Sequence, residues 1–158
     1  EMIQGFKTIN YANDLKKINK NFLKKFKCKS KTKKFIFNNC DIIIIATDLN
    51  KSSYKIINKK TINDFKNNPL IVNIGRGGSI DSQALLKCLN LRKIRGACLD
   101  VFDIEPLKKN SLFKKFDNCI LSSHNAFNTK DEVEFVNKNT LNNIFKGLKL
   151  NAENIKKF

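Results

Sequence analysis

The stretch Asp41-Ile42-Ile43-Ile44-Ile45-Ala46-Thr47 decides the fold of this chain. Its isoleucines are β-branched, which favours a strand, and they leave neither face of that strand polar. A strand that is apolar on both faces is typical of a parallel sheet whose two sides are covered. We therefore expect this stretch to be a buried strand of an α/β domain.

Further strand patterns lie on either side of it: Lys7–Ala12 alternates between apolar and polar residues, and Leu70–Ile74 repeats the apolar signature. They predict strands over Lys7–Ala12, Leu70–Ile74, Gly96–Phe102 and Cys119–Ser122. Asp81 is a good N-cap for a helix over Ser82–Leu89, and Thr129 begins a capping box that opens a final helix. Strands that alternate with helices at these lengths predict βαβ units and a parallel sheet.

The composition is strongly basic but does not by itself indicate a nucleic-acid partner. The 158 residues carry 31 Lys and Arg against 14 Asp and Glu, a net charge of +17. Nearly all of these cations are lysines, whereas nucleic-acid readers favour arginine for its bidentate fork. The excess of Lys, Asn and Ile indicates AT-rich codon usage. The one dense run, Lys16–Lys34, is expected to be a solvated helix or loop.

The same composition excludes several other classes. No apolar run approaches the roughly 20 residues that a membrane span requires, and the first residues lack a signal-peptide pattern. The five cysteines are odd in number and show no C-x-x-C pair, so neither a disulfide framework nor a metal site is predicted. A reducing, cytoplasmic location follows as the expectation.

Chemically capable side chains follow four of the predicted strands. Thr47 follows the isoleucine run Ile42–Ile45, and Arg76 stands among three glycines after Leu70–Ile74. The strand that begins at Gly96 leads to Asp100 and Glu105. The strand that begins at Cys119 leads to His124, the single histidine of the chain. Carboxyl ends of parallel strands meet at one edge of a sheet, where ligands bind.

Each of these residues also has a structural explanation when it is taken alone. Arg76 fits a surface turn, Glu105 an acidic turn before a proline, and His124 a satisfied structural histidine. Together they favour chemistry, because an arginine grips a carboxylate and a Glu–His pair moves a proton.

Three segments carry a family resemblance. Asn73–Asp81 resembles the pattern V-N-x-x-R-G-x-x-[VI]-D, Arg95–Pro106 resembles G-A-x-L-D-V-F-x-x-E-P, and Ser123–Ala126 resembles P-H-x-A. These are the motifs of the D-isomer-specific 2-hydroxyacid dehydrogenases, and the resemblance runs from about Gly5 to about Lys149.

The resemblance implies an oxidoreductase that interconverts a 2-keto acid and a D-2-hydroxy acid with NAD or NADP. Arg76 would bind the substrate carboxylate, while His124 and Glu105 would form the proton relay. The cofactor-binding residues implied are Thr47, Ile74, Gly75, Arg76, Asp100 and His124.

The implied fold is a Rossmann-type parallel sheet with helices on both faces. It is expected to be incomplete, because the family's first strand and Gly-rich loop lie upstream of Lys7–Ala12. Residues 1–128 would be the later part of the dinucleotide-binding domain, and residues 129–158 a helix returning toward a substrate domain. The chain alone is then expected to be inactive, and the full-length enzyme to be a homodimer.

Some positions depart from the family pattern. Ala12 stands where NAD-preferring relatives carry a ribose-binding acid, so either Asn13 or Asp14 substitutes, or Lys16 and Lys17 favour NADP. Ser123 replaces a proline. With Phe127 the chain reads A-F-x-T, a pattern that resembles the D-lactate branch of the family more than the phosphoglycerate branch.

Two alternatives remain at this level. One is a non-catalytic, dehydrogenase-like nucleotide sensor or corepressor that keeps the cofactor pocket without turnover. The other is a nucleic-acid-binding module, against which the scarcity of aromatics in Lys16–Lys34 counts. The preferred partner is a small 2-keto or 2-hydroxy acid, with no specific nucleic acid and no membrane.

Overall fold

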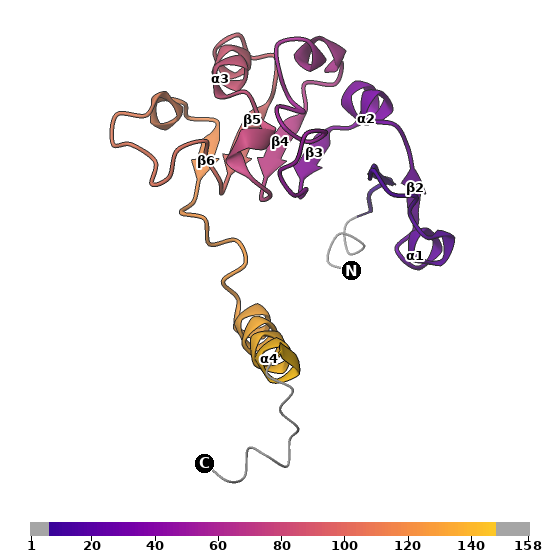
Figure 1. Ribbon diagram of the computed structural model, residues 1–158. Helices are drawn as coiled ribbons and strands as arrows, with labels where there is room; N and C mark the ends of the chain where they lie inside the picture. Colours follow the sequence, from indigo (N-terminus) through magenta and orange to yellow (C-terminus); the bar gives the residue numbers. More distant parts are fainter. Residues whose placement is uncertain (1–6, 148–158) are drawn as a thin grey trace. The chain divides into compact units, whose positions relative to one another are not determined.

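A computed structural model describes residues 7–147 of the chain (Figure 1). The chain divides into two compact units with their boundary between Ser123 and His124. The first unit holds the strands β1 to β6 and the helices α1 to α3. The second holds the helix α4 (Lys130–Gly147).

The main sheet of the first unit is parallel, as predicted. Its strands are β3 (Ile42–Ile45), β4 (Leu70–Asn73), β5 (Gly96–Leu99) and β6 (Cys119–Leu121), in that order. A second parallel pair joins β1 (Asn10–Ala12) to β2 (Cys28–Ser30). All five predicted strands are therefore present, each shorter than its sequence pattern.

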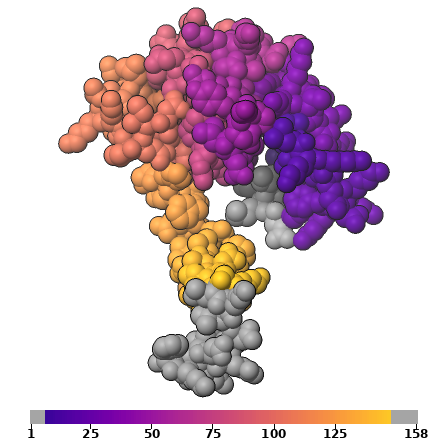
Figure 2. Space-filling model, in the orientation of Figure 1, coloured from indigo at the N-terminus to yellow at the C-terminus, as the bar shows by residue number. Residues whose placement is uncertain are grey.

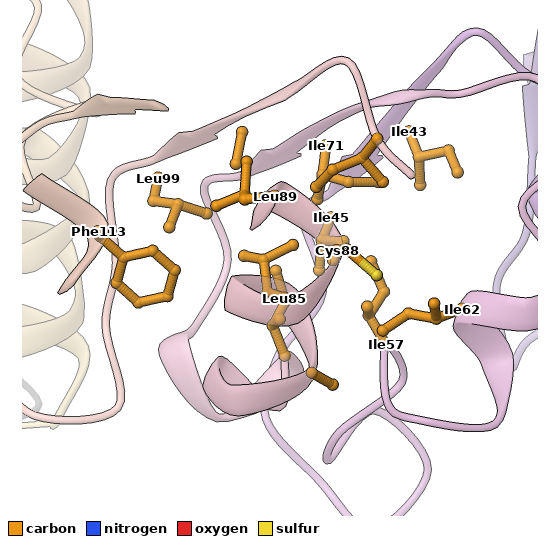
Figure 3. Packing of buried hydrophobic residues seen from close by; sticks show 14 of the residues in the cluster. Ile43, Ile45, Ile57, Ile62, Ile71, Leu85, Cys88, Leu89, Leu99 and Phe113 are labelled. Atoms are coloured by element: carbon orange, nitrogen blue, oxygen red, sulfur yellow. The ribbon is translucent and has the colours of Figure 1, made fainter. Parts of the chain in front are cut away.

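The hydrophobic core lies on one face of the main sheet. The strands contribute side chains that share a register row, such as Ile43, Ile71 and Ala97. Helix α3 (Ser82–Asn90) packs on them with Leu85, Cys88 and Leu89 (Figure 3). Helix α2 (Lys33–Asn39) and the 3-10 helices η2 (Thr61–Asp64) and η4 (Leu112–Lys115) add Phe37, Ile62 and Phe113.

The expectation that β3 is buried on both faces is wrong for the described residues. Ile43 and Ile45 point into the core, but Ile42 is 51% exposed and Ile44 47%. Ile120 of β6 lies on the same outer face and is 69% exposed. The reason is that the buried cluster among residues 7–147 draws only on the opposite face of the sheet.

The lysine-rich run Lys16–Lys34 is more ordered than its composition suggests. It contains helix α1 (Lys20–Lys25), strand β2 and the start of α2. Side-chain caps explain both helices, because Asn19 accepts a hydrogen bond from the backbone N–H of Asn21, and Thr32 from that of Phe35. Strand β2 was not predicted, since Cys-Lys-Ser has almost no apolar pattern.

Helix α3 confirms its sequence prediction. The Asp81 carboxylate accepts a hydrogen bond of 3.1 Å from the backbone N–H of Ala84, and it lies 3.5 Å from the Lys55 ammonium. These partners, the Ala84 N–H first, hold the pKa of Asp81 below its usual value.

Replacing this cap should destabilise the unit in a pH-dependent way. We expect Asp81→Ala to lower the free energy of unfolding by about 1 kcal/mol at neutral pH. A lowered folded-state pKa means that the carboxylate stabilises the fold above its unfolded-state pKa and ceases to do so as pH falls through the folded value. Urea titrations at pH 7 and pH 3 check this.

The control for that experiment is Asp81→Asn, which keeps an acceptor and removes the charge. It should cost less than Asp81→Ala at pH 7. A difference between Asp81→Ala and the parent chain that is as large at pH 3 as at pH 7 would contradict the assignment to the ionised cap.

The second unit begins its helix as predicted. The Thr129 hydroxyl accepts a hydrogen bond of 3.3 Å from the backbone N–H of Glu132, which is one half of the expected capping box. The apolar side chains of α4 remain partly exposed within the described residues: Val133, Val136, Leu141 and Ile144.

Candidate active site

The turn that follows β4 is fixed by a buried asparagine. Asn73 is 1% exposed, and its side-chain amide donates a 3.1 Å hydrogen bond to the backbone oxygen of Arg76. Its Oδ1 accepts another, also of 3.1 Å, from the backbone N–H of Gly75. One side chain therefore holds both ends of the turn that carries the arginine.

Asn73 is a site residue that the sequence reasoning did not single out. Its importance could have been inferred from its place in the run Leu70–Ile74, where it is the one polar residue among apolar ones. A buried polar side chain must find hydrogen-bond partners, so such a residue points to a backbone segment that it organises.

The Arg76 side chain extends from this turn into solvent. Its Nη1 donates a 2.7 Å hydrogen bond to the carbonyl of Gly75. Within the part of the chain that the structure describes, no carboxylate pairs with the guanidinium. A cation held on a fixed turn with N–H groups to spare suits an anionic ligand.

The glycines beside Arg76 allow the backbone of three strand ends to come together. A Cβ added at Gly75 would lie 2.7 Å from the Thr47 carbonyl oxygen after β3. A Cβ at Gly77, the first residue of the 3-10 helix η3 (Gly77–Ser79), would overlap the Phe102 carbonyl after β5. The three loops therefore pack backbone against backbone at the carboxyl edge of the sheet.

A methyl group at Gly77 should disrupt this packing. We expect Gly77→Ala to destabilise the unit by about 3 kcal/mol, because its Cβ meets backbone atoms that have little room to shift. Denaturant unfolding followed by circular dichroism measures the change.

Gly78→Ala is the matched control for that variant. A Cβ there meets the flexible end of the Leu49 side chain at 3.0 Å rather than backbone. It should therefore cost much less than Gly77→Ala, and equal effects of the two variants would argue against the close approach.

The loop after β5 contains both predicted acids. Asp100 is buried at 4% exposure and accepts a 2.6 Å hydrogen bond from the Ser122 hydroxyl after β6. Glu105 is exposed, and its Oε1 accepts a 2.9 Å hydrogen bond from the backbone N–H of Phe102. The loop is also tied to the start of α3, where Ser82 donates a 2.6 Å hydrogen bond to Asp103.

His124 opens the second unit. Its backbone is in the left-handed region, with φ of 58°, which non-glycine residues adopt rarely. Thr47, Ile74, Gly75, Arg76, Asp100 and Glu105 all lie at strand ends of the first unit. Glu105 belongs to the first unit and His124 to the second, and their pairing stays a prediction.

Comparison with known proteins decides the family. Residues 1–126 match the family model described as D-isomer specific 2-hydroxyacid dehydrogenase, NAD binding domain. The chain belongs to this family. A glyoxylate reductase of Thermofilum pendens is 41% identical to it over 86 residues, which are 54% of this chain and 25% of that protein.

Solved structures of the dehydrogenase family show the same fold. The NAD-complexed D-isomer-specific 2-hydroxyacid dehydrogenase of Lactobacillus delbrueckii ssp. bulgaricus superposes with a TM-score of 0.78 at 20% identity, covering 95% of this chain and 49% of that one. A relative from Xanthobacter autotrophicus Py2, solved with NADPH and MES, gives a TM-score of 0.57 at 24% identity, covering 61% and 32%. The chain thus spans a quarter to a half of the length of these dehydrogenases.

The residues at this edge fit the nucleotide that the family model implies. Ile74 after β4 is 46% exposed, and Thr47 and Asp100 follow the neighbouring strands β3 and β5. An apolar wall with a few convergent polar groups is the usual make-up of a cofactor site. That Thr47, Ile74, Gly75 and Asp100 bind the dinucleotide stays a prediction.

Other kinds of site receive no support among residues 7–147. That part of the chain holds no group of three His, Cys, Asp or Glu residues that could bind a metal ion. None of its helices combines the length and the apolar character needed to cross a membrane.

The five cysteines are free, and burial, with the nearby Cys98, raises the pKa of the Cys119 thiol to about 11.

Proposed function

We propose that the protein containing this chain interconverts a 2-keto acid and a D-2-hydroxy acid with a nicotinamide cofactor. The observation that carries the proposal is Arg76, which Asn73 holds at the carboxyl end of β4 with no carboxylate beside it in the described residues. Membership of the dehydrogenase family supports it.

Arg76 is proposed to bind the substrate carboxylate. A guanidinium offers two parallel N–H groups to the two oxygens of a carboxylate, which fixes the position of the substrate as well as its charge. The same cation polarises the adjacent keto group, and so favours the negative charge that grows on its oxygen during reduction.

His124 is proposed to give the proton to that oxygen during reduction and to take it back during oxidation. Glu105 is proposed to orient the imidazole. A carboxylate has two oxygens, so Glu105 can accept the Phe102 N–H on Oε1 and offer the other oxygen to the histidine. The left-handed backbone at His124 supports a functional role, because such conformations gather at active sites.

Thr47, Ile74, Gly75, Asp100, Arg76 and His124 are proposed to line the cofactor site. The cofactor, when bound, supplies the hydride, and the protein supplies orientation, charge and exclusion of water. A homodimer in the cytoplasm remains the expected assembly and location, together with the absence of a specific nucleic-acid partner.

The proposal is tested by following oxidation of reduced cofactor by the complete protein with glyoxylate, pyruvate and hydroxypyruvate. We expect turnover with at least one of them, and chiral analysis should find only the D product from a keto acid that yields a chiral one. Cofactor binding without turnover across a broad 2-keto-acid panel would instead favour the non-catalytic sensor.

A further inference from the structure

The carboxyl ends of β1 and β2 are tied together. Ala12 and Ser30 are register partners, and one residue further on the backbone N–H of Lys31 donates a 2.9 Å hydrogen bond to the Ala12 carbonyl. The side-chain amide of Asn13 donates a 2.8 Å bond to the Lys31 carbonyl. Residues that follow the two strands therefore share one place at the edge of this sheet.

The last residue of β1 offers no acidic side chain to a ribose hydroxyl. Ala12 ends β1 with a methyl group, and the side-chain nitrogen of Asn13 donates to the Lys31 carbonyl. Asp14 is the only acid between residues 7 and 39, and its Oδ1 accepts a 2.9 Å hydrogen bond from the backbone N–H of Lys16. One oxygen of that carboxylate is thus engaged with the following backbone, two residues beyond the end of β1.

Lysines follow both strand ends in the sequence. Lys16 and Lys17 follow β1, and Lys31, Lys33 and Lys34 follow β2, all of them exposed. The Lys31 ammonium lies 4.7 Å from the centroid of the Phe35 ring, a cation–π contact that restrains it. In Figure 2 the indigo and violet atoms of this segment stand at the surface of the first unit.

Doubly wound nucleotide-binding folds read the adenosine ribose at the end of an early strand. An acid there bonds the 2′-hydroxyl of NAD, whereas a basic side chain accommodates the 2′-phosphate of NADP. In this chain β1 and β2 are the early strands, because they precede the four strands of the main sheet in the sequence.

We infer that this site takes a dinucleotide with a 2′-phosphate in preference to one without it, and that Lys16 and Lys17 determine the preference. The inference rests on the proposed function, since it names the cofactor of the same reaction. The charge alone would attract any polyanion, whereas a specific site responds to the position of the phosphate on the ribose.

The test measures binding to the complete protein by calorimetry at fixed ionic strength. We expect NADPH to bind about tenfold more tightly than NADH, or better. Among fragments, adenosine 2′,5′-bisphosphate should bind more tightly than adenosine 3′,5′-bisphosphate, which carries the same charge. Equal affinity for the two isomers would show generic attraction to lysines and overturn the inference.

Variants assign the preference to residues. Lys16→Gln combined with Lys17→Gln should abolish the preference for NADPH, while Lys114→Gln with Lys115→Gln, an equal change of charge on η4, should preserve it. Ala12→Asp should shift the preference toward NADH. Preserved preference in the Lys16, Lys17 variant would overturn the assignment.

The failure of this inference is distinguishable from failure of the proposed function. NADH binding as tightly as NADPH, with turnover intact, overturns only the inference. Binding of neither dinucleotide overturns the proposed function, and the inference with it.

Discussion

His124→Gln should lower kcat for keto-acid reduction by a factor on the order of a hundred to ten thousand in the complete protein. The proposed role of the imidazole is to deliver a proton to the keto oxygen, and a general acid contributes an effect of this size. Glutamine keeps hydrogen-bonding capacity but cannot carry a titratable proton. Steady-state kinetics under saturating cofactor would measure the change.

Two measurements separate chemistry from folding in that variant. The unfolding transition should stay close to that of the parent protein, and Lys130→Gln, an exposed change six residues further on, should leave kcat unaltered. An unchanged kcat in His124→Gln would remove the proton-donor role.

Arg76→Lys should reduce kcat/KM for the keto acid by a factor on the order of a hundred or more. Lysine preserves the positive charge but presents a compact ammonium, so it loses the two-point grip on a carboxylate. The loss should appear mainly in KM if the grip is equally strong in the ground state, and in kcat as well if it tightens on the developing oxyanion.

Arg92→Lys is the matched control for the arginine. Arg92 is exposed beyond the end of α3 and has no part in the proposed site, so its replacement should change kcat/KM little. Arg76→Gln should be worse than Arg76→Lys, because it removes the charge as well as the fork. Equal activity of all these variants would place the substrate carboxylate elsewhere.

The parts of the fold with strong local signals were predictable from the sequence. Helix α3 combines the Asp81 cap with a single apolar stripe, and both kinds of evidence agree on its start and its buried face. Four of the strands are short apolar runs that no helical pattern matches. By contrast, β2 has three residues and one lysine, and only its pairing with β1 makes it a strand.

Burial was harder to predict than secondary structure. Ile42 and Ile44 are as apolar as Ile43 and Ile45, so the sequence distinguishes no face of β3. Which face is covered depends on where α2 and α3 pack, and that is a tertiary property. The same limit explains Asn73, whose identity signals a buried partner without saying which backbone atoms it holds.

For the candidate site, the positions of the residues were predictable from the sequence, whereas their hydrogen bonds were not. Strand ends could place Arg76, Asp100 and Glu105 on one edge, because parallel strands share their polarity. The hydrogen bonds of Asp100 to Ser122 and of Glu105 to Phe102 depend on loop conformations, which residue spacing does not determine. The predicted relay between Glu105 and His124 crosses the boundary between the two units and still awaits its test.

The double hydrogen bond of Asn73 also has a dynamic consequence. The Gly75 amide hydrogen is held by a side chain that is itself part of the interior, so it can exchange with solvent only when the edge of the core opens. The turn that carries Arg76 therefore opens together with the sheet and not as an independent loop. A ligand that reaches this arginine meets a surface already arranged before binding, and the entropy of ordering that turn was spent when the domain folded.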